Sequence, residues 1–197
     1  MRATHRITEA RLPETTTCKP TTRSLYTWEI DEAYKVFASG LIYERVRVHE
    51  CTTWTNTLDR VGRKLKSMPP ANVNNAVTLL NHCFFPIRLL DQPVQVGHPE
   101  HYKLGWLIHE LTHAWQYQHI GLSYIWLALK VQFQLKGSAY DFEGEEGLKK
   151  RRRQEWTLLK FNLEQQGDIA RTYYDRLSRG KDVQAWLPYI EEFQKSA

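Results

Sequence analysis

Residues 104–115 read Leu-Gly-Trp-Leu-Ile-His-Glu-Leu-Thr-His-Ala-Trp, and this stretch decides the fold. Apolar side chains recur along it every three to four residues, which is the pattern of a helix with one face in the core; they are Leu104, Ile108, Leu111 and Trp115. The pattern predicts a central, mostly buried helix over about residues 100–119. Within it, His109, Glu110 and His113 form the motif H-E-x-x-H.

The spacing of this motif favours a metal site. Residues four apart on a helix point the same way, so His109 and His113 can hold one ion between them. Glu110 lies about 100° round the helix from His109, where it can take a proton from a water on the metal. A surface helix whose histidines meet only water is the plain alternative. Burial argues against that alternative, because unpaired polar groups in a core are costly.

A catalytic zinc takes three protein ligands and keeps a fourth position for water. Glu164 is the favoured third ligand, because it and Asp168 are four residues apart on a predicted helix over 162–178 and face the same way. Asp168 would then accept the free ring N–H of a ligating histidine and fix its tautomer. Gly167 between them would let the two helices approach closely.

Two other sources of a third ligand stay open. His119 occupies the third-histidine position of the metzincin pattern, but Gln116 stands where that pattern needs glycine to turn the chain back. A histidine at a helix end more often bonds the last carbonyls. The second source is an acidic, turn-rich loop over 137–147 that contains Glu143, Glu145 and Glu146. Its plain interpretation is a solvated loop beside the basic run Lys149–Arg153.

Strand patterns come early in the chain and helix patterns late. Residues 43–49 alternate as a strand does, and residues 76–87 read as a hairpin or one long strand. A charged helix is expected over about 148–159. This order predicts an α+β fold, mainly helical, with a small antiparallel sheet upstream of the H-E-x-x-H helix. Residues 1–24 are polar and read as a flexible arm before a single domain over 25–197.

Composition limits the classes of protein that remain. The 197 residues suit one domain, and a net charge of +5 does not by itself imply nucleic acid. Cys18, Cys51 and Cys83 are odd in number and widely spaced, which argues against a disulfide framework and for reducing surroundings during folding.

Targeting signals are also informative. The N-terminus lacks the apolar region of an ordinary signal peptide, and the longest apolar stretch, residues 120–133, is too short to span a bilayer. The chain is therefore expected to be cytoplasmic when made, without a membrane span. Export by a dedicated injection system would leave no such signal.

The chain resembles zinc peptidases of the gluzincin group. The sequence HELTHAW, followed about fifty residues later by Glu-x-x-Gly-Asp over 164–168, is similar to the pattern of thermolysin-like enzymes. A closer resemblance covers roughly residues 44–178, with the stretches RVRVH, AVTLLNHCFFP and LIHELTHAWQ. It is to the small zincin-like domain of unknown function that is found beside bacterial contractile injection systems, Rhs elements and polymorphic toxins.

The resemblance implies a zincin-like fold and zinc-dependent hydrolysis of peptide bonds. One Zn²⁺ would be held by His109, His113 and Glu164, with Glu110 as the base and Asp168 supporting a ligating histidine. The edge strand before the motif helix, here within residues 76–85, would bind the substrate backbone. The substrate would be a protein or peptide, for example an effector or an injection-system component.

The chain departs from the thermolysin-like pattern in two ways. Leu163 stands where these enzymes carry Asn, with Asn162 one step earlier. Their downstream His and Tyr, which steady the transition state, have no matching motif. The remaining candidates for that role share only a suitable side chain; they are Tyr173, Tyr174, His101, Tyr140 and His98.

Two rival functions follow from other features. The missing transition-state motif and the seven Trp residues also suit a non-catalytic module of an injection apparatus, with zinc as a structural ion. The basic run Lys149–Arg153 and the basic stretch Arg60–Lys66 would suit nucleic acid. A run of five cations is usually a solvated helix face, so the expectation is that no nucleic acid is bound.

Overall fold

The computed structural model describes residues 18–56, 75–122 and 141–195. The helices in these ranges are α1 (Thr27–Phe37), α3 (Tyr102–Ile120), α5 (Gly144–Arg153), α6 (Leu163–Ser178) and α7 (Leu187–Phe193). The strands are β1 (Thr21–Arg23), β2 (Arg47–Glu50), β3 (Val77–Leu79) and β4 (His82–Phe84). Short 3-10 turns lie at Ala38–Gly40, Tyr43–Arg45 and Leu158–Lys160. The expected α+β class is therefore confirmed.

The four strands form one sheet in the order β1-β2-β4-β3. β1 pairs antiparallel with β2, and β3 pairs antiparallel with β4, but β2 and β4 are parallel. The expected all-antiparallel sheet is thus wrong in one pairing. The hairpin β3–β4 enters the sheet with its second strand beside β2, and a strand that returns through a long connection can pair in either direction. β3 is left at the edge of the sheet.

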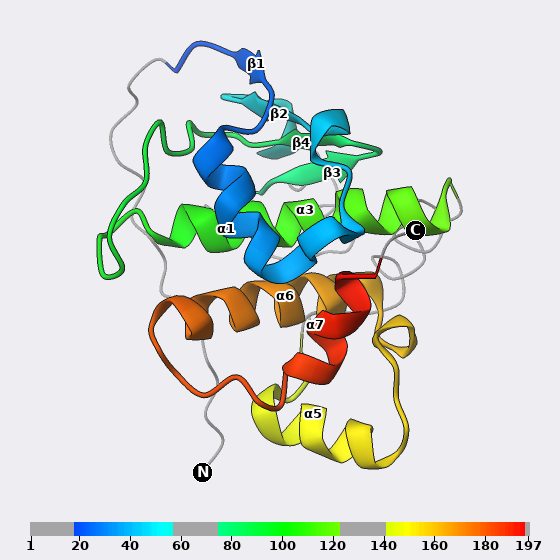
Figure 1. Ribbon diagram of the computed structural model, residues 1–197. Coiled ribbons are helices and arrows are strands. Elements are labelled where there is room, and N and C mark those ends of the chain that lie inside the picture. Colours follow the sequence, from blue (N-terminus) through cyan, green and yellow to red (C-terminus); the bar gives the residue numbers. More distant parts are fainter. Residues whose placement is uncertain (1–17, 57–74, 123–140, 196–197) are drawn as a thin grey trace, which may run out of the picture.

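Helix α3 lies at the centre of the molecule. Figure 1 shows it between the sheet on one side and α6 on the other. The helix is buried continuously from Lys103 to Gln116, except for a partly buried Trp106. The predicted motif helix is confirmed within two residues at each end. Because α3 is covered on both sides, its polar side chains must find partners inside the protein.

Helices α1 and α7 complete the core around α3. Trp115 Nε1–H of α3 donates to the Phe193 carbonyl at 3.0 Å, and the Phe37 and Phe193 rings meet edge to face with centroids 5.6 Å apart. Gly40 comes just after α1, where the backbone lies against the end of α7. A Cβ on Gly40 would lie 1.9 Å from the Phe193 carbonyl oxygen. Through these contacts α1 and α7 pack against each other and against α3.

Part of the acidic stretch that was predicted as a loop over 137–147 is helical. Helix α5 begins at Gly144, inside the expected loop, and ends at Arg153 rather than near 159. The reason is electrostatic. Glu145 and Glu146 stand in the first turn and the cations of the basic run in the last, which is the arrangement that the helix dipole favours. Glu143 precedes the helix in a left-handed conformation with φ 63°.

The N-terminal part of the described chain is tied to the sheet. Thr21–Arg23 lie inside the expected flexible arm and form β1, while residues 1–17 of that arm lie outside the described ranges. A disulfide joins Cys18 to Cys51, with Cα atoms 5.6 Å apart, so the expectation of unpaired cysteines is wrong for these two. The antiparallel pairing of β1 with β2 brings the two cysteines together although they are 33 residues apart in sequence. Cys83 is free and buried.

None of the helices in the described part of the chain has the length and apolar content that crossing a membrane requires.

Candidate metal centre

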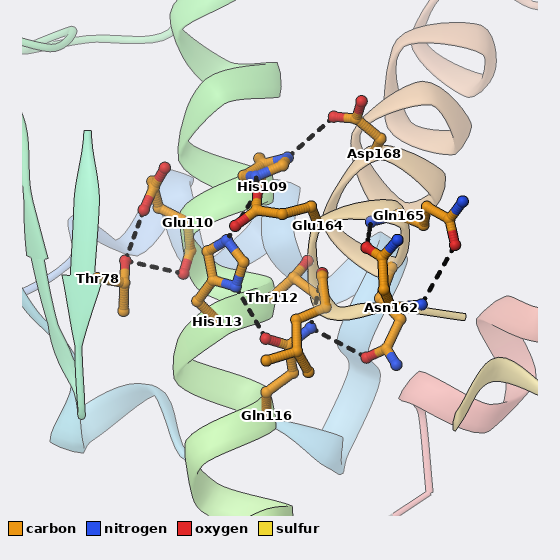
Figure 2. A network of polar contacts seen from close by, with 12 residues as sticks. Thr78, His109, Glu110, Thr112, His113, Gln116, Asn162, Glu164, Gln165 and Asp168 are labelled. Atoms are coloured by element: carbon orange, nitrogen blue, oxygen red, sulfur yellow. Dashed lines mark hydrogen bonds and ion pairs between the residues drawn. The ribbon is translucent and has the colours of Figure 1, made fainter. Parts of the chain in front are cut away.

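Two helices bring three metal-ligating side chains together. His109 and His113 project from α3, and Glu164 projects toward them from the first turn of α6 (Figure 2). One ligand atom from each of these buried residues lies within 4.8 Å of the others, so the group could hold a metal ion. The candidate third ligand is thus beside the two histidines.

The start of α6 is fixed by a capping box. Asn162 Oδ1 accepts from the Gln165 backbone N–H at 2.9 Å, and the Gln165 side chain accepts in turn from the Asn162 N–H at 3.2 Å. Reciprocal bonds of this kind satisfy two donors that a helix start leaves open. Asn162 therefore serves as the N-cap and holds Glu164 at a defined place in the first turn.

Each histidine is turned by a hydrogen bond on its outer side. His109 Nδ1–H donates to Asp168 Oδ1 at 3.0 Å, and His113 Nδ1–H donates to Gln116 Oε1 at 2.8 Å. Both rings then present Nε2 to the same oxygen, Glu164 Oε2, at 3.3 Å from His109 and 3.7 Å from His113. An imidazole that donates through Nδ1 keeps the Nε2 lone pair for a metal.

The spacing of these atoms fits a divalent ion. Two ligands about 2.1 Å from a tetrahedral zinc lie about 3.4 Å apart, close to the observed separations. The side chains are 9%, 10% and 13% exposed for His109, His113 and Glu164, so the group still reaches solvent. A donor set of two imidazoles and one carboxylate is that of a catalytic rather than a structural zinc site.

The charges within the group are strongly coupled. Burial disfavours a charged His109, but hydrogen bonds and charge from Asp168 and Glu164 outweigh it and raise its pKa to about 10. Burial opposes ionisation of Glu164 as well, yet the charge of His113 and the bond to His109 hold the pKa of this carboxyl well below its usual range. The pKa of His113 is raised by Glu164 against the effect of burial. A cation bound here would replace the protons that these imidazoles attract.

Gly167 is where α6 comes closest to the histidines. A Cβ at this position would lie 2.7 Å from His109 Cε1 and 2.8 Å from His109 Nδ1. The predicted close approach of the two helices is therefore confirmed. Asp168, the next residue, also forms an ion pair with Arg171. The Arg171 Nη2 lies 3.0 Å from Asp168 Oδ1 and holds this carboxylate in place.

Glu110 points from α3 toward the sheet and away from α6 (Figure 2). The hydroxyl of Thr78 in β3 donates to Glu110 Oε2 at 2.8 Å, and both residues are buried. Glu110 is the one charged residue between the two histidines, so its carboxylate lies beside the group without belonging to it. The structure thus separates the candidate base from the candidate ligands as the motif predicts.

Gln116 and Thr78 are parts of the site that sequence reasoning missed. Gln116 is fully buried and, besides accepting from His113, donates to the Leu163 carbonyl at 2.9 Å and to Gln166 Oε1 at 3.0 Å. Its position three residues after His113 on one helix is the signal that could have identified it. Thr78 has no such local signal, because it reaches Glu110 from another element.

The alternative third ligands are engaged elsewhere. His119 Nδ1 lies 2.9 Å from the Trp115 carbonyl at the end of α3, as expected for a helix-end histidine. The three acidic residues at the start of α5 pair with nearby cations: Glu143 with Arg151, Glu145 with Lys149 and Arg176, and Glu146 with Lys149. None of these side chains joins the group formed by α3 and α6.

The candidate transition-state residues also lie away from the group. The Tyr174 hydroxyl donates to Glu32 Oε2 of α1 at 2.8 Å, and the His101 ring stacks on Tyr174 with centroids 6.2 Å apart. Tyr173 is nine residues beyond Glu164, about 180° round α6 from it. His98 accepts from the Glu100 N–H, and Tyr140 lies outside the described residues.

The basic run is partly neutralised by its acidic neighbours. Lys149 lies 2.7 Å from Glu145 and Arg151 lies 3.2 Å from Glu143. Arg152 and Arg153 line, with Lys149, an open cavity of about 380 Å³ between α5 and the chain before α7. The other basic stretch, Arg60–Lys66, lies outside the described residues.

Comparison with known proteins gives one partial similarity. A stretch of 74 residues is 39% identical to the type VI secretion system spike protein VgrG2b of Pseudomonas aeruginosa strain PAO1. It covers 36% of this chain and spans 6% of the length of that spike protein. No protein-family model matches, and no similar solved structure was found. The similarity is therefore to a small part of a secretion-system spike protein.

Proposed function

We propose that this chain is a zinc-dependent metallopeptidase linked to a bacterial secretion or contractile injection system. One observation carries the proposal: both histidines donate through Nδ1 to fixed acceptors and so aim Nε2 at Glu164, with Glu110 adjacent on the same helix. A group arranged only for packing would not need both rings held in one tautomer. The partial similarity to a spike protein supports the link to secretion.

The roles of the residues follow from this arrangement. His109, His113 and Glu164 would hold the ion, while Asp168 and Gln116 keep the rings in the tautomer that leaves Nε2 free. A bound zinc would polarise the substrate carbonyl and acidify a water molecule. Glu110 would serve as the base that accepts a proton from the attacking water and as the acid that gives it to the leaving amine.

The edge strand supports a peptide as the substrate. Leu79 faces His82 across a two-residue turn, so these two residues exchange the first backbone bonds of the hairpin. β3 is the outermost strand at one end of the described sheet, so its outer side pairs with no other described strand. An extended peptide can add to such an edge, beside the middle of α3, where Glu110 lies.

Substitution of the base tests the function. Glu110→Gln protein should retain one zinc per chain by elemental analysis and should lose hydrolysis of casein or a peptide library by at least about a hundredfold. Glu146→Gln is the matched control, because Glu146 is 82% exposed and pairs with Lys149 on the surface. Cleavage by the Glu110→Gln protein at the parent rate would remove Glu110 from its role.

A non-catalytic zinc module of the same system is the second candidate. It is favoured by the positions of Tyr173, Tyr174 and His101, none of which reaches the group to steady an oxyanion. This module would bind zinc with the parent affinity and cleave nothing. A digest with and without chelator separates the two functions, because only a peptidase gives fragments that the chelator abolishes.

A further inference from the structure

Glu110 is held by one side-chain contact from the edge strand. Thr78 Oγ1 lies 2.8 Å from Glu110 Oε2 and 3.2 Å from the backbone carbonyl of the same residue. Thr78 is 7% exposed and Glu110 4%, so water competes little for this bond. Figure 2 shows the two contacts spanning the gap between β3 and α3.

The strand pairing explains why a hydroxyl stands here. Along β3 the exposure alternates, with Thr78 facing inward and Leu79 outward. Thr78 is directly opposite Cys83 of β4. The Cys83 thiol is hydrogen-bonded to the Thr78 side chain, and its sulfur lies 3.8 Å from the Glu110 carbonyl oxygen. Valine has nearly the shape of threonine and would fill the same space. The hydroxyl therefore adds only its hydrogen bonds.

The contact gives the two oxygens of the Glu110 carboxylate different surroundings. Oε2 is occupied by Thr78, whereas Oε1 accepts no hydrogen bond from any side chain or backbone group in the described ranges. A threonine side chain is stiff about χ1, so its hydroxyl also limits rotation of the longer glutamate. A carboxylate fixed through one oxygen keeps the other free at a defined place.

We propose that Thr78 is a positioning residue, whose hydroxyl holds Glu110 in the orientation that proton transfer requires. This inference rests on the proposed peptidase function.

Kinetics of two variants test the proposal. Thr78→Val should bind zinc as the parent does and lower kcat about 10–100-fold with KM within about threefold, because the backbone is unchanged. Thr78→Ser restores the hydroxyl and should bring kcat back to within about threefold. An unchanged kcat in Thr78→Val, a rise confined to KM, or a failure of serine to rescue would each overturn the proposal.

A second measurement does not depend on hydrolysis. In chelator-treated protein, denaturant unfolding of Thr78→Val, Glu110→Met and the double variant forms a double-mutant cycle. A hydrogen bond to a charged group predicts a coupling of about tenfold or more in the unfolding equilibrium constant. Additive effects would overturn the contact. If the parent cleaves no peptide, the peptidase function fails, while this cycle still decides whether Thr78 holds Glu110.

Thr55→Val is the matched control. Thr55 is also fully buried, and its hydroxyl donates to the Thr52 carbonyl at 3.0 Å rather than to the site. Its loss should lower stability without changing kcat and should not couple to Glu110→Met. An equal loss of kcat in Thr55→Val and Thr78→Val would show a general packing effect and overturn the positioning role.

Discussion

Gly167 decides how closely the His109 imidazole can lie against α6. In Gly167→Ala protein, a Cβ within 3.0 Å of three ring atoms would push the imidazole away from Asp168 and Glu164. We expect zinc affinity to fall about 10–100-fold and the free energy of unfolding to fall by about 1–3 kcal/mol. Chelator competition and denaturant unfolding measure the two effects.

Gly105→Ala controls for the general effect of alanine at the contact between α3 and α6. Its Cβ would lie 3.4 Å from the flexible Arg171 side chain, which can move. Here alanine should keep zinc affinity and raise helix stability by up to about 1 kcal/mol. Parent-like zinc affinity in Gly167→Ala would contradict the importance of this close approach.

The His109 charge predicts how stability depends on pH in chelator-treated protein. Burial opposes the charge, but Asp168 and Glu164 raise the pKa of His109 to about 10. A raised pKa gives stability that is full below the unfolded value near 6.5 and is lost as the pH rises toward 10. The free energy of unfolding should therefore decrease by a few kcal/mol between pH 6.5 and 10 in denaturant titrations.

Two comparisons make this pH dependence specific. Glu164→Gln removes one of the groups that raise the pKa of His109, so the decrease should become smaller. Saturating zinc should abolish or reverse it, because the metal competes with protons for the imidazoles and binds better at higher pH. A flat profile in the chelator-treated parent would contradict the proposed charge coupling.

The site could be predicted at the residues whose partners are local in sequence. His109, Glu110 and His113 share one helix, and Glu164 and Asp168 share another, so helical spacing alone places each set on one face. Thr78 could not be found this way, because its partner Glu110 is 32 residues away and on another element. A threonine in a short strand has many possible partners until the strands are placed.

At the scale of helices and strands, elements with signals in their own sequence were predicted, and features that depend on distant parts of the chain were not. Helices α3 and α6 follow from periodicity and end signals within their own sequences. The pattern over residues 76–87 left a hairpin and one long strand open, and the structure has the hairpin β3–β4. The pairing of β2 with β4 joins strands that are far apart in the sequence, and local patterns do not specify its direction, so the parallel pairing was not predicted. The start of α5 at Gly144 was not predicted, because the charges at both ends of this helix stabilise it.

The disulfide gives a prediction for β1. Replacing Cys18 or Cys51 by serine removes a link that closes a loop of 33 residues, so the free energy of unfolding should fall by about 2–4 kcal/mol. Denaturant unfolding of the oxidised proteins measures it. Reductant should destabilise the parent by a similar amount and leave either variant unchanged. Equal stability of oxidised and reduced parent would contradict a stabilising role.

At the scale of the whole molecule, the α+β class was predictable because elements of each type cluster along the chain. The apolar pattern of α3 predicted a central, mostly buried helix, but not its place between the sheet and α6. The convergence of α3 and α6 was expected only through the pairing of the motif with Glu164. The layers also explain why the candidate site lies inside the domain yet near one edge strand.

Oxidation at Cys18 and Cys51 has a consequence for a protein that leaves the cell that makes it. Cytosolic glutathione keeps such cysteines as thiols, whereas the periplasm and the exterior favour the bond. Before transit, β1 would rely on its short ladder and on Arg23, which pairs with Glu29 and Glu50. In an oxidising compartment the disulfide would anchor the strand covalently, so an exported chain would be more stable at its destination than in the cytosol.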